Sequence, residues 1–175
     1  MVADRALPAS AQARASVGGR RIEYAPHACF ACGELNEHGL RMQLHAEDGR
    51  CWSELELPPR FQGWDGIAHG GIISTILDEV MAWSLVAQDS WGVTARLGIA
   101  FARPVPLGRR VRAEGWVVDG RRRVSRTAAR LMDAADGTIL ATADGTYVAA
   151  TGDRREALKA RYQFRLVPGS DGAGA

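Results

Sequence analysis

The stretch Gly66-Ile67-Ala68-His69-Gly70-Gly71, continued by Ile72-Ile73-Ser74-Thr75-Ile76-Leu77-Asp78-Glu79-Val80-Met81-Ala82-Trp83, decides the fold of this chain. It begins as a glycine hinge and continues as an apolar segment of about five helical turns. Apolar side chains cover most of the circumference of that helix: Ile72, Ile73, Ile76, Leu77, Val80, Met81, Leu85 and Val86. The pattern therefore predicts a helix that is buried on nearly all sides.

A narrow polar stripe runs along the same helix. Its members, at i, i+1, i+4 and i+5, are Ser74, Thr75, Asp78 and Glu79. Burying a carboxylate is costly unless the group is paired or functional. A buried carboxylate is also a common general base in enzymes. The stripe is therefore expected to form one wall of a site.

Composition excludes several classes of function. The 22 basic and 20 acidic residues give a net charge of +2, which is too balanced for an obligate nucleic-acid binder. The first twenty residues lack a continuous apolar core, so no secretory signal is expected. Asp78 and Glu79 argue against a membrane-spanning helix. Three cysteines, an odd number, argue against a disulfide framework and fit a reducing cytoplasm. A cytoplasmic protein without nucleic-acid or membrane partners is expected.

The rest of the chain predicts a single α+β domain at 23–151, between a flexible arm at 1–22 and a short helix and tail at 152–175. The turn Asp119-Gly120 is expected to join two antiparallel strands. One sheet long enough to curl over the central helix follows from this order. The expected strands are Arg41–Ala46, Cys51–Leu57, Val93–Ala102, Arg110–Val118, Val124–Met132 and Thr138–Ala149, and the terminal helix, capped by Asp153, is Arg154–Tyr162.

Four pieces of the sequence resemble the hotdog-fold acyl-CoA thioesterases, specifically the PaaI-like (phenylacetyl-CoA thioesterase-like) family. Together they cover residues 26–150. The spacing from His69 to Asp78 and the strand end that follows make the match specific. The pieces are Cys29-Phe30-Ala31-Cys32-Gly33 with Asn36 and Gly39-Leu40; Gly63-Trp64-Asp65-Gly66-Ile67-Ala68-His69-Gly70-Gly71; Asp78; and Thr94 with Phe101-Ala102-Arg103-Pro104-Val105-Pro106-Leu107-Gly108.

The resemblance implies a hotdog fold and hydrolysis of an acyl-coenzyme A to the free acid and coenzyme A, without a metal or cofactor. It makes Asp78 the catalytic carboxylate and Thr94 the residue that orients water. It also implies a homodimer or a dimer of dimers, in which Asp78 and Thr94 of one subunit face Gly71 of the other. Ala100 and Ala102 would run along the pantetheine arm.

The residues themselves leave several roles open. The N–H groups of Gly70 and Gly71 can stabilise a developing oxyanion at the helix N-terminus, or the glycines only allow close packing. Asp78 can act as a general base or as a nucleophile. Glu79 is the rival carboxylate, with an ion pair at the dimer seam as its expected role. His69 is expected to hold the loop by hydrogen bonds rather than to transfer protons.

Three further features each have two interpretations. Asn36 either lines the site or caps the entry turn. Cys29 and Cys32 are expected to be small structural thiols rather than zinc ligands, although His27, His38 and Cys51 are also present. The side chains of Arg121, Arg122 and Arg123 either form a solvated hairpin tip or bind the phosphates of coenzyme A.

Two alternative functions compete with hydrolysis. A hotdog dehydratase or hydratase would need a histidine–acid pair in other motifs, which the sequence lacks. A non-catalytic acyl-CoA-binding hotdog protein would keep the pocket without turnover. The acyl group stays open between aromatic and medium-chain, since it depends on which side chains point inward among Phe61, Trp64, Met81 and Trp83.

Overall fold

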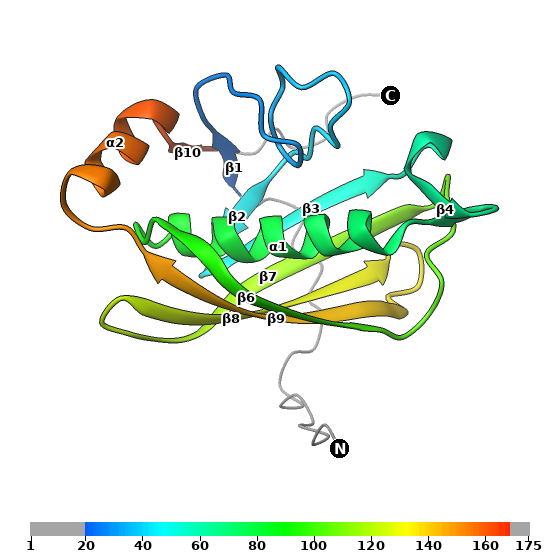
Figure 1. Cartoon of the computed structure of the whole chain (residues 1–175). Coiled ribbons are helices and arrows are strands. Elements are labelled where there is room, and N and C mark those ends of the chain that lie inside the picture. The colour runs from blue at the N-terminus through cyan, green and yellow to red at the C-terminus, as the bar shows by residue number, and fades with distance from the viewer. Residues whose placement is uncertain (1–19, 169–175) are drawn as a thin grey trace.

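The computed structural model describes residues 20–168, and an eight-stranded antiparallel sheet curls around one long helix (Figure 1). The spatial order of the strands is β10-β1-β2-β3-β7-β8-β9-β6. The α+β class expected from the sequence is therefore confirmed. The elements are β1 Arg20–Glu23, β2 His45–Glu47, β3 Arg50–Glu56, the 3-10 turn Pro59–Phe61, β4 Gln62–Trp64, β5 Ile67–Ala68, α1 Gly70–Val86, β6 Gly92–Phe101, β7 Arg110–Arg121, β8 Val124–Asp133, β9 Ile139–Ala149, α2 Gly152–Tyr162 and β10 Arg165–Val167.

The helix α1 forms the centre of the core, as its apolar circumference predicts. Ile76, Leu77, Val80 and Met81 are 0% exposed. The helix packs most closely on β7, where a Cβ on Gly115 would lie 2.6 Å from the carbonyl of Val80. Because a side chain at that point has no room, this glycine sets how closely the sheet approaches α1. The same packing fixes the direction in which each polar residue of α1 points.

The edges of the sheet differ from the sequence prediction. Residues 20–22, assigned to the arm, form most of β1, because Ile22 is buried in the core. The remainder of that arm, residues 1–19, lies outside the described residues. The strand β10 was not expected, and it pairs with β1. Helix α2 begins after Thr151 rather than after Asp153. Within residues 20–168, no helix has the length and apolar character needed to cross a membrane.

The hairpin turn between β7 and β8 lies three residues later than predicted. Asp119 and Gly120 are still within β7, where Asp119 accepts hydrogen bonds from Arg126 on the opposite strand. Arg122 adopts a left-handed φ of 55° and turns the chain. Arg122 and Arg123 therefore form the turn itself, and Arg121 is the last residue of β7.

Candidate active site

Asp78 lies at the centre of a hydrogen-bonded group built from three elements. Its Oδ1 accepts a hydrogen bond from Thr94 Oγ1 at 2.9 Å and one from Tyr147 OH at 2.6 Å. Thr94 on β6 is the register partner of Tyr147 on β9, so the sheet presents the two hydroxyls side by side to α1. A register shift between Thr94 and Arg96 marks a bulge at this position, and bulges re-aim side chains near sites. The structure thus brings together the two residues expected to do chemistry and adds a third.

Tyr147 is the site residue that the sequence did not indicate. Its side chain is 2% exposed, and burial together with the nearby Asp78 carboxylate raises the pKa of its phenol. The phenol therefore keeps its proton and stays a hydrogen-bond donor to Asp78. With Oδ1 held by two donors, the other carboxylate oxygen of Asp78 keeps its lone pairs for a proton or an electrophile.

The N-terminus of α1 is capped by His69. Its Nδ1 accepts a hydrogen bond from the N–H of Gly71 at 2.9 Å, and its backbone carbonyl accepts from Ile72 at 2.9 Å. This geometry suits the loop-holding role expected for His69. It also means that the Gly71 N–H already has an acceptor. That N–H can donate to a substrate oxygen only after His69 turns away.

Gly71 and Asp78 are too far apart in one chain to act on the same carbonyl group. Both lie on α1, and seven residues of helix correspond to about 10 Å along the axis. A thioester held by Asp78 therefore cannot reach the N–H groups of Gly70 and Gly71 of the same chain. Each chain carries two separate parts of the expected site.

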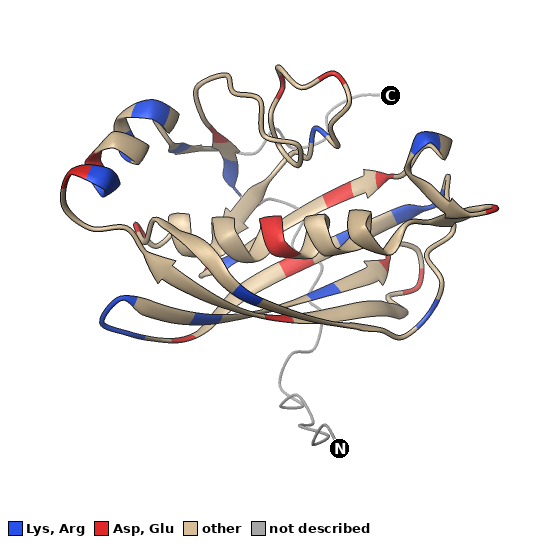
Figure 2. Cartoon of the chain, in the orientation of Figure 1, with Lys and Arg blue, Asp and Glu red and all other residues tan. Residues whose placement is uncertain are grey.

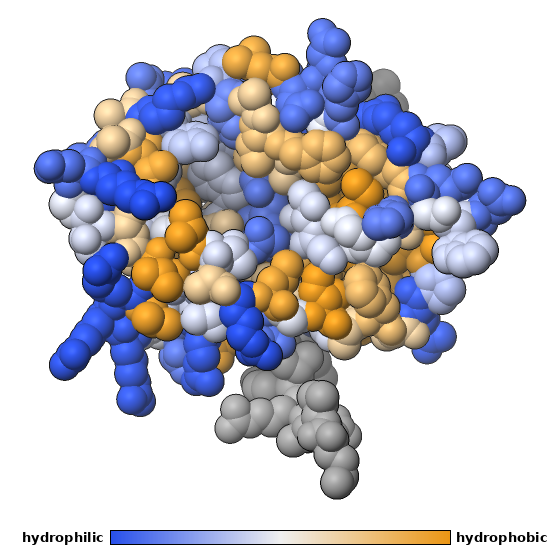
Figure 3. Space-filling view, in the orientation of Figure 1, coloured by the Kyte–Doolittle hydropathy of each residue, from blue (hydrophilic) through white to orange (hydrophobic). Residues whose placement is uncertain are grey.

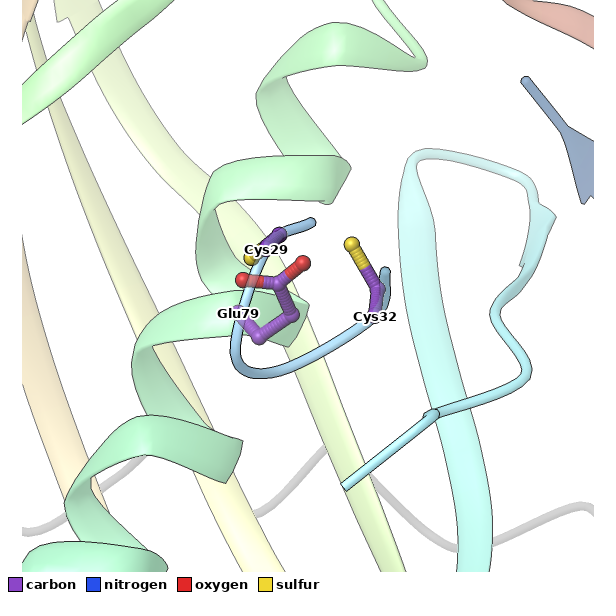
Figure 4. Close-up of side chains that lie close together, drawn as sticks. All are labelled: Cys29, Cys32 and Glu79. Carbon is purple, nitrogen blue, oxygen red and sulfur yellow. The ribbon is translucent and has the colours of Figure 1, made fainter. Parts of the chain in front are cut away.

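The four polar residues of the stripe on α1 do not face one common site, so the expectation that they form one wall of a site is wrong. Ser74 and Thr75 donate hydrogen bonds to the backbone of the preceding turn. Glu79 lies against the turn that carries Cys29 and Cys32 (Figure 4). Within one chain Glu79 contacts Cys29, Cys32 and Trp83, and its expected ion pair at a subunit seam stays a prediction.

Glu79 has an unusual proton affinity. Its Oε1 accepts a hydrogen bond from Trp83 Nε1 at 2.7 Å. Burial, with the nearby Cys29 thiolate as the second cause, raises the pKa of Glu79 to about 7. Glu79, although next to Asp78 in sequence, thus lies in a different environment and can gain or lose a proton near neutral pH.

The cysteine turn offers three donor atoms for a metal ion. The sulfurs of Cys29 and Cys32 and a carboxylate oxygen of Glu79 all lie within 4.8 Å of one another. His27 Nε2 lies 3.8 Å from the Cys32 sulfur, but Nδ1 of His27 accepts the N–H of Cys29, so Nε2 carries the proton. A structural zinc site takes four deprotonated ligands, and the part of the chain that is described supplies only three at this place. The absence of zinc stays a prediction.

The remaining candidate residues lie apart from Asp78. Asn36 donates to the carbonyl of Ala28 and accepts from the N–H of His38, so it organises the entry turn as a cap does. Ala100 and Ala102 are exposed at the end of β6. The arginine turn, residues 121–123, is exposed at the tip of the β7–β8 hairpin. The ribbon of this tip is coloured as basic in Figure 2, and hydrophilic side chains project there in Figure 3.

Apolar side chains are exposed along β6. Val93, Leu97 and Phe101 are exposed on β6, and Trp64 on β4 is 83% exposed. Among the described strands β6 pairs only with β9, so its other edge keeps unpaired backbone groups. A cavity of about 410 Å³ lies elsewhere, between β1, β10 and the cysteine turn, and Cys32 is part of its lining.

Comparison with known proteins adds the following. Residues 65–140 match the family model of the thioesterase superfamily. No curated protein matches the chain in sequence. A solved thioesterase superfamily protein is 26% identical, with a TM-score of 0.66 over 69% of this chain. The chain spans only 62% of the length of that protein.

Two bacterial structures are also similar. A phenylacetic acid degradation-related protein from Ralstonia eutropha is 26% identical, with a TM-score of 0.56 over 63% of this chain and 86% of its own. A hypothetical thioesterase from Streptococcus pneumoniae, solved with coenzyme A, is 19% identical, with a TM-score of 0.56 over 59% of this chain and 82% of its own. That protein was also solved as two alanine variants, of an aspartate and of a threonine. The two positions are 16 residues apart, as are Asp78 and Thr94 here.

Proposed function

We propose that the chain hydrolyses the thioester of an acyl-coenzyme A to the free acid and coenzyme A, because residues 65–140 match the thioesterase superfamily model and the chain has a hotdog fold. The observation that carries the proposal is the Asp78 carboxylate held by Thr94 and Tyr147 at the surface of α1. The coenzyme A in the similar Streptococcus structure supports this substrate class. The matching separation of an aspartate and a threonine in that protein supports the choice of residues.

The chemistry assigned to Asp78 needs no metal. Its free carboxylate oxygen removes a proton from a water molecule, which attacks the thioester carbonyl. In the alternative route the same oxygen attacks the carbonyl and forms an anhydride that water then hydrolyses. In both routes the leaving thiolate needs little protonation at neutral pH. Thr94 and Tyr147 hold the Asp78 carboxylate in one orientation, so the binding energy of the substrate is not needed to orient it.

The complete site is assigned to two copies of the chain. In one chain the Gly70 and Gly71 N–H groups lie about 10 Å from Asp78 along the helix. The unpaired edge and apolar surface of β6 provide a face for a second copy. In a homodimer, or a dimer of dimers, the α1 N-terminus of one subunit would face Asp78 of the other. Light scattering tests this, and a stable and fully active monomer contradicts it.

Binding of the coenzyme A part of the substrate is assigned to exposed residues that lie outside the two α1 helices. Arg121, Arg122 and Arg123 can bind the phosphates of coenzyme A, since guanidinium groups form paired hydrogen bonds with phosphate. Ala100 and Ala102, with small side chains, would leave room for the pantetheine arm. His69 must release the Gly71 N–H when the thioester binds.

The decisive experiment compares two adjacent carboxylates of α1. Release of coenzyme A is measured over a panel of aromatic and medium-chain acyl-CoAs for wild type, Asp78→Asn and Glu79→Gln. The loss of a positioned base should lower the kcat of Asp78→Asn by about 10²–10⁴. Glu79→Gln should keep kcat near wild type. Near-normal turnover by Asp78→Asn would refute the assignment, and tight acyl-CoA binding by wild type without turnover would identify a non-catalytic binding protein.

A further inference from the structure

We propose that Cys29 and Cys32 form a reversible disulfide, in which Cys29 is the attacking thiol and the Glu79 carboxylate accepts the proton of Cys32. The two sulfurs and a Glu79 oxygen come from two elements, the turn before β2 and helix α1. All three atoms lie within 4.8 Å of one another (Figure 4). The three cysteines of the chain are free thiols. The Asp78 site uses neither Cys29, Cys32 nor Glu79.

The cysteine turn is built to hold the two sulfurs close together. The N–H of Gly33 donates to the carbonyl of Cys29 at 3.0 Å, which closes one turn of chain. The side chain of His27 accepts the N–H of Cys29, and its carbonyl accepts the N–H of Leu35. A Cβ on Gly33 would lie 2.4 Å from backbone atoms of His27 and Cys29, so only glycine fits there. A disulfide between residues three apart then requires mainly side-chain rotation.

The two thiols differ in reactivity. Cys29 is half-buried, and a hydrogen bond from the Cys32 thiol is the largest of the causes that lower the pKa of Cys29 to about 5. Cys29 is therefore a thiolate at neutral pH, and the thiolate is the form that attacks disulfides. Cys32 is buried, and its hydrogen bond to Cys29 and burial raise its pKa. Cys32 thus needs a base before it can react.

Glu79 is placed to be that base. One of its carboxylate oxygens lies within 4.8 Å of the Cys32 sulfur, and its pKa of about 7 lets it take a proton at neutral pH and release it again. The other groups that act on Glu79 are the Cys29 thiolate and Asp78, whose charges raise its pKa, and Trp83, which donates a hydrogen bond to it. The attacking thiol, Cys29, is half-buried and so partly open to solvent, and a cavity of about 410 Å³ borders Cys32.

The oxidant is a small organic disulfide, and the reaction consists of two thiol–disulfide exchange steps. The Cys29 thiolate attacks one sulfur of the oxidant, which forms a mixed disulfide and releases one thiolate. Cys32 then gives its proton to Glu79 and attacks the Cys29 sulfur, which releases the second thiolate. The protein loses two electrons, and the oxidant takes them up as its two thiols.

The first test follows the products on the full chain. The protein is treated with hydroxyethyl disulfide, quenched with acid and analysed by intact mass and peptide mapping. Wild type should lose two hydrogens and gain a Cys29–Cys32 link that dithiothreitol reverses. Cys32→Ser should stop at a mixed disulfide on Cys29. Cys51→Ser, which removes the fully buried third thiol, should behave as wild type. Unreacted thiols in wild type, or adducts on Cys32 in place of the link, would overturn the proposal.

The second test separates a proton-accepting role of Glu79 from a structural one. The closure of the mixed disulfide is timed at pH 7 in Glu79→Gln, with circular dichroism confirming that the variant is folded. Loss of the base should slow closure by about 10²–10⁴-fold and let the mixed disulfide accumulate. The control variant Glu56→Gln, which changes an exposed carboxylate on β3, should close at the wild-type rate. Wild-type closure by Glu79→Gln would remove Glu79 from the mechanism.

The pH dependence of alkylation checks the attacking thiol separately. The rate at which iodoacetamide modifies Cys29 should stay flat between pH 6 and 8, because the thiolate is already formed. An ordinary thiol would react about tenfold faster for each pH unit over that range. A tenfold rise per unit at Cys29 would contradict its assignment. None of these measurements depends on thioester hydrolysis.

Discussion

The substitution Tyr147→Phe tests the link between fold and chemistry most directly. It removes one hydroxyl, which donates to Asp78 Oδ1 at 2.6 Å, and leaves the buried ring in place. A hydrogen bond to a charged group contributes about 1.5–3 kcal/mol. If the whole amount is lost from the folded state, Tm falls by roughly 3–12 °C for a chain of this size. If the same interaction positions the carboxylate in the transition state, kcat falls by about 10–100-fold.

The assay measures kcat and KM for one acyl-CoA beside the thermal transition. We expect KM to change little, since Tyr147 contacts the carboxylate and not the substrate. The matched control is Tyr24→Phe, which removes a hydroxyl that donates to the carbonyl of Cys32 at 2.9 Å. This control should lose about 0.5–1.5 kcal/mol of stability and keep wild-type kcat.

A double-mutant cycle completes the test. On the Asp78→Asn background, Tyr147→Phe should have no further effect on kcat, because its target carboxylate is gone. Wild-type kcat in Tyr147→Phe would refute the positioning role. An equal fold-loss on both backgrounds would show that Tyr147 acts through some other group.

Three further predictions concern charge and metal. Replacing Arg121–Arg123 by alanine should raise KM for acyl-CoA and leave kcat nearly unchanged. The rise in KM should become smaller as salt is added, since exposed charges are screened within about 10 Å at 0.1 M. An unaltered KM at low salt would show that these arginines are only a solvated hairpin tip. The pKa of Glu79 is about 7 in the folded chain and 4.5 in the unfolded chain, so between these values only the folded chain keeps the proton. The free energy of unfolding of wild type should therefore fall relative to that of Glu79→Gln as pH rises from 4.5 to about 7, by at most about 3 kcal/mol. Parallel curves of stability against pH for the two proteins would contradict this. Elemental analysis should find no stoichiometric zinc, and chelation should leave Tm unchanged; one zinc per chain, lost together with folding, would reverse the interpretation of Cys29 and Cys32.

The central helix and the class of the fold are predictable from sequence because both follow from local patterns. The apolar circumference of 70–86 predicts a buried helix, and α1 spans those residues. The long strands of the second half alternate or end at turns and lie within a few residues of their predicted positions. The short strands β1 and β10 were missed, since three or four residues carry too little periodicity to be recognised.

The site was predictable only where one element carries it. The resemblance supplied Asp78 and Thr94, whose contact the structure contains. Tyr147 lies 69 residues from Asp78, and their contact depends on the register between β6 and β9. The two carboxylates were expected on one wall, but consecutive helical residues point about 100° apart. Glu79 therefore meets the cysteine turn, while Asp78 meets the sheet.

The pairing of β1 with β10 has a consequence for how the protein is made. Arg21 on β1 lies opposite Val167 on β10. Strand β1 can therefore be paired on both sides only after β10 has been synthesised. During translation the outer edge of β1 stays open while every other strand of the sheet already has its neighbours available. An open strand edge invites pairing with other chains. A ribosome that stalls, or a protease that cuts, between α2 and β10 would therefore release a chain with an intact central helix and a sheet edge exposed to aggregation.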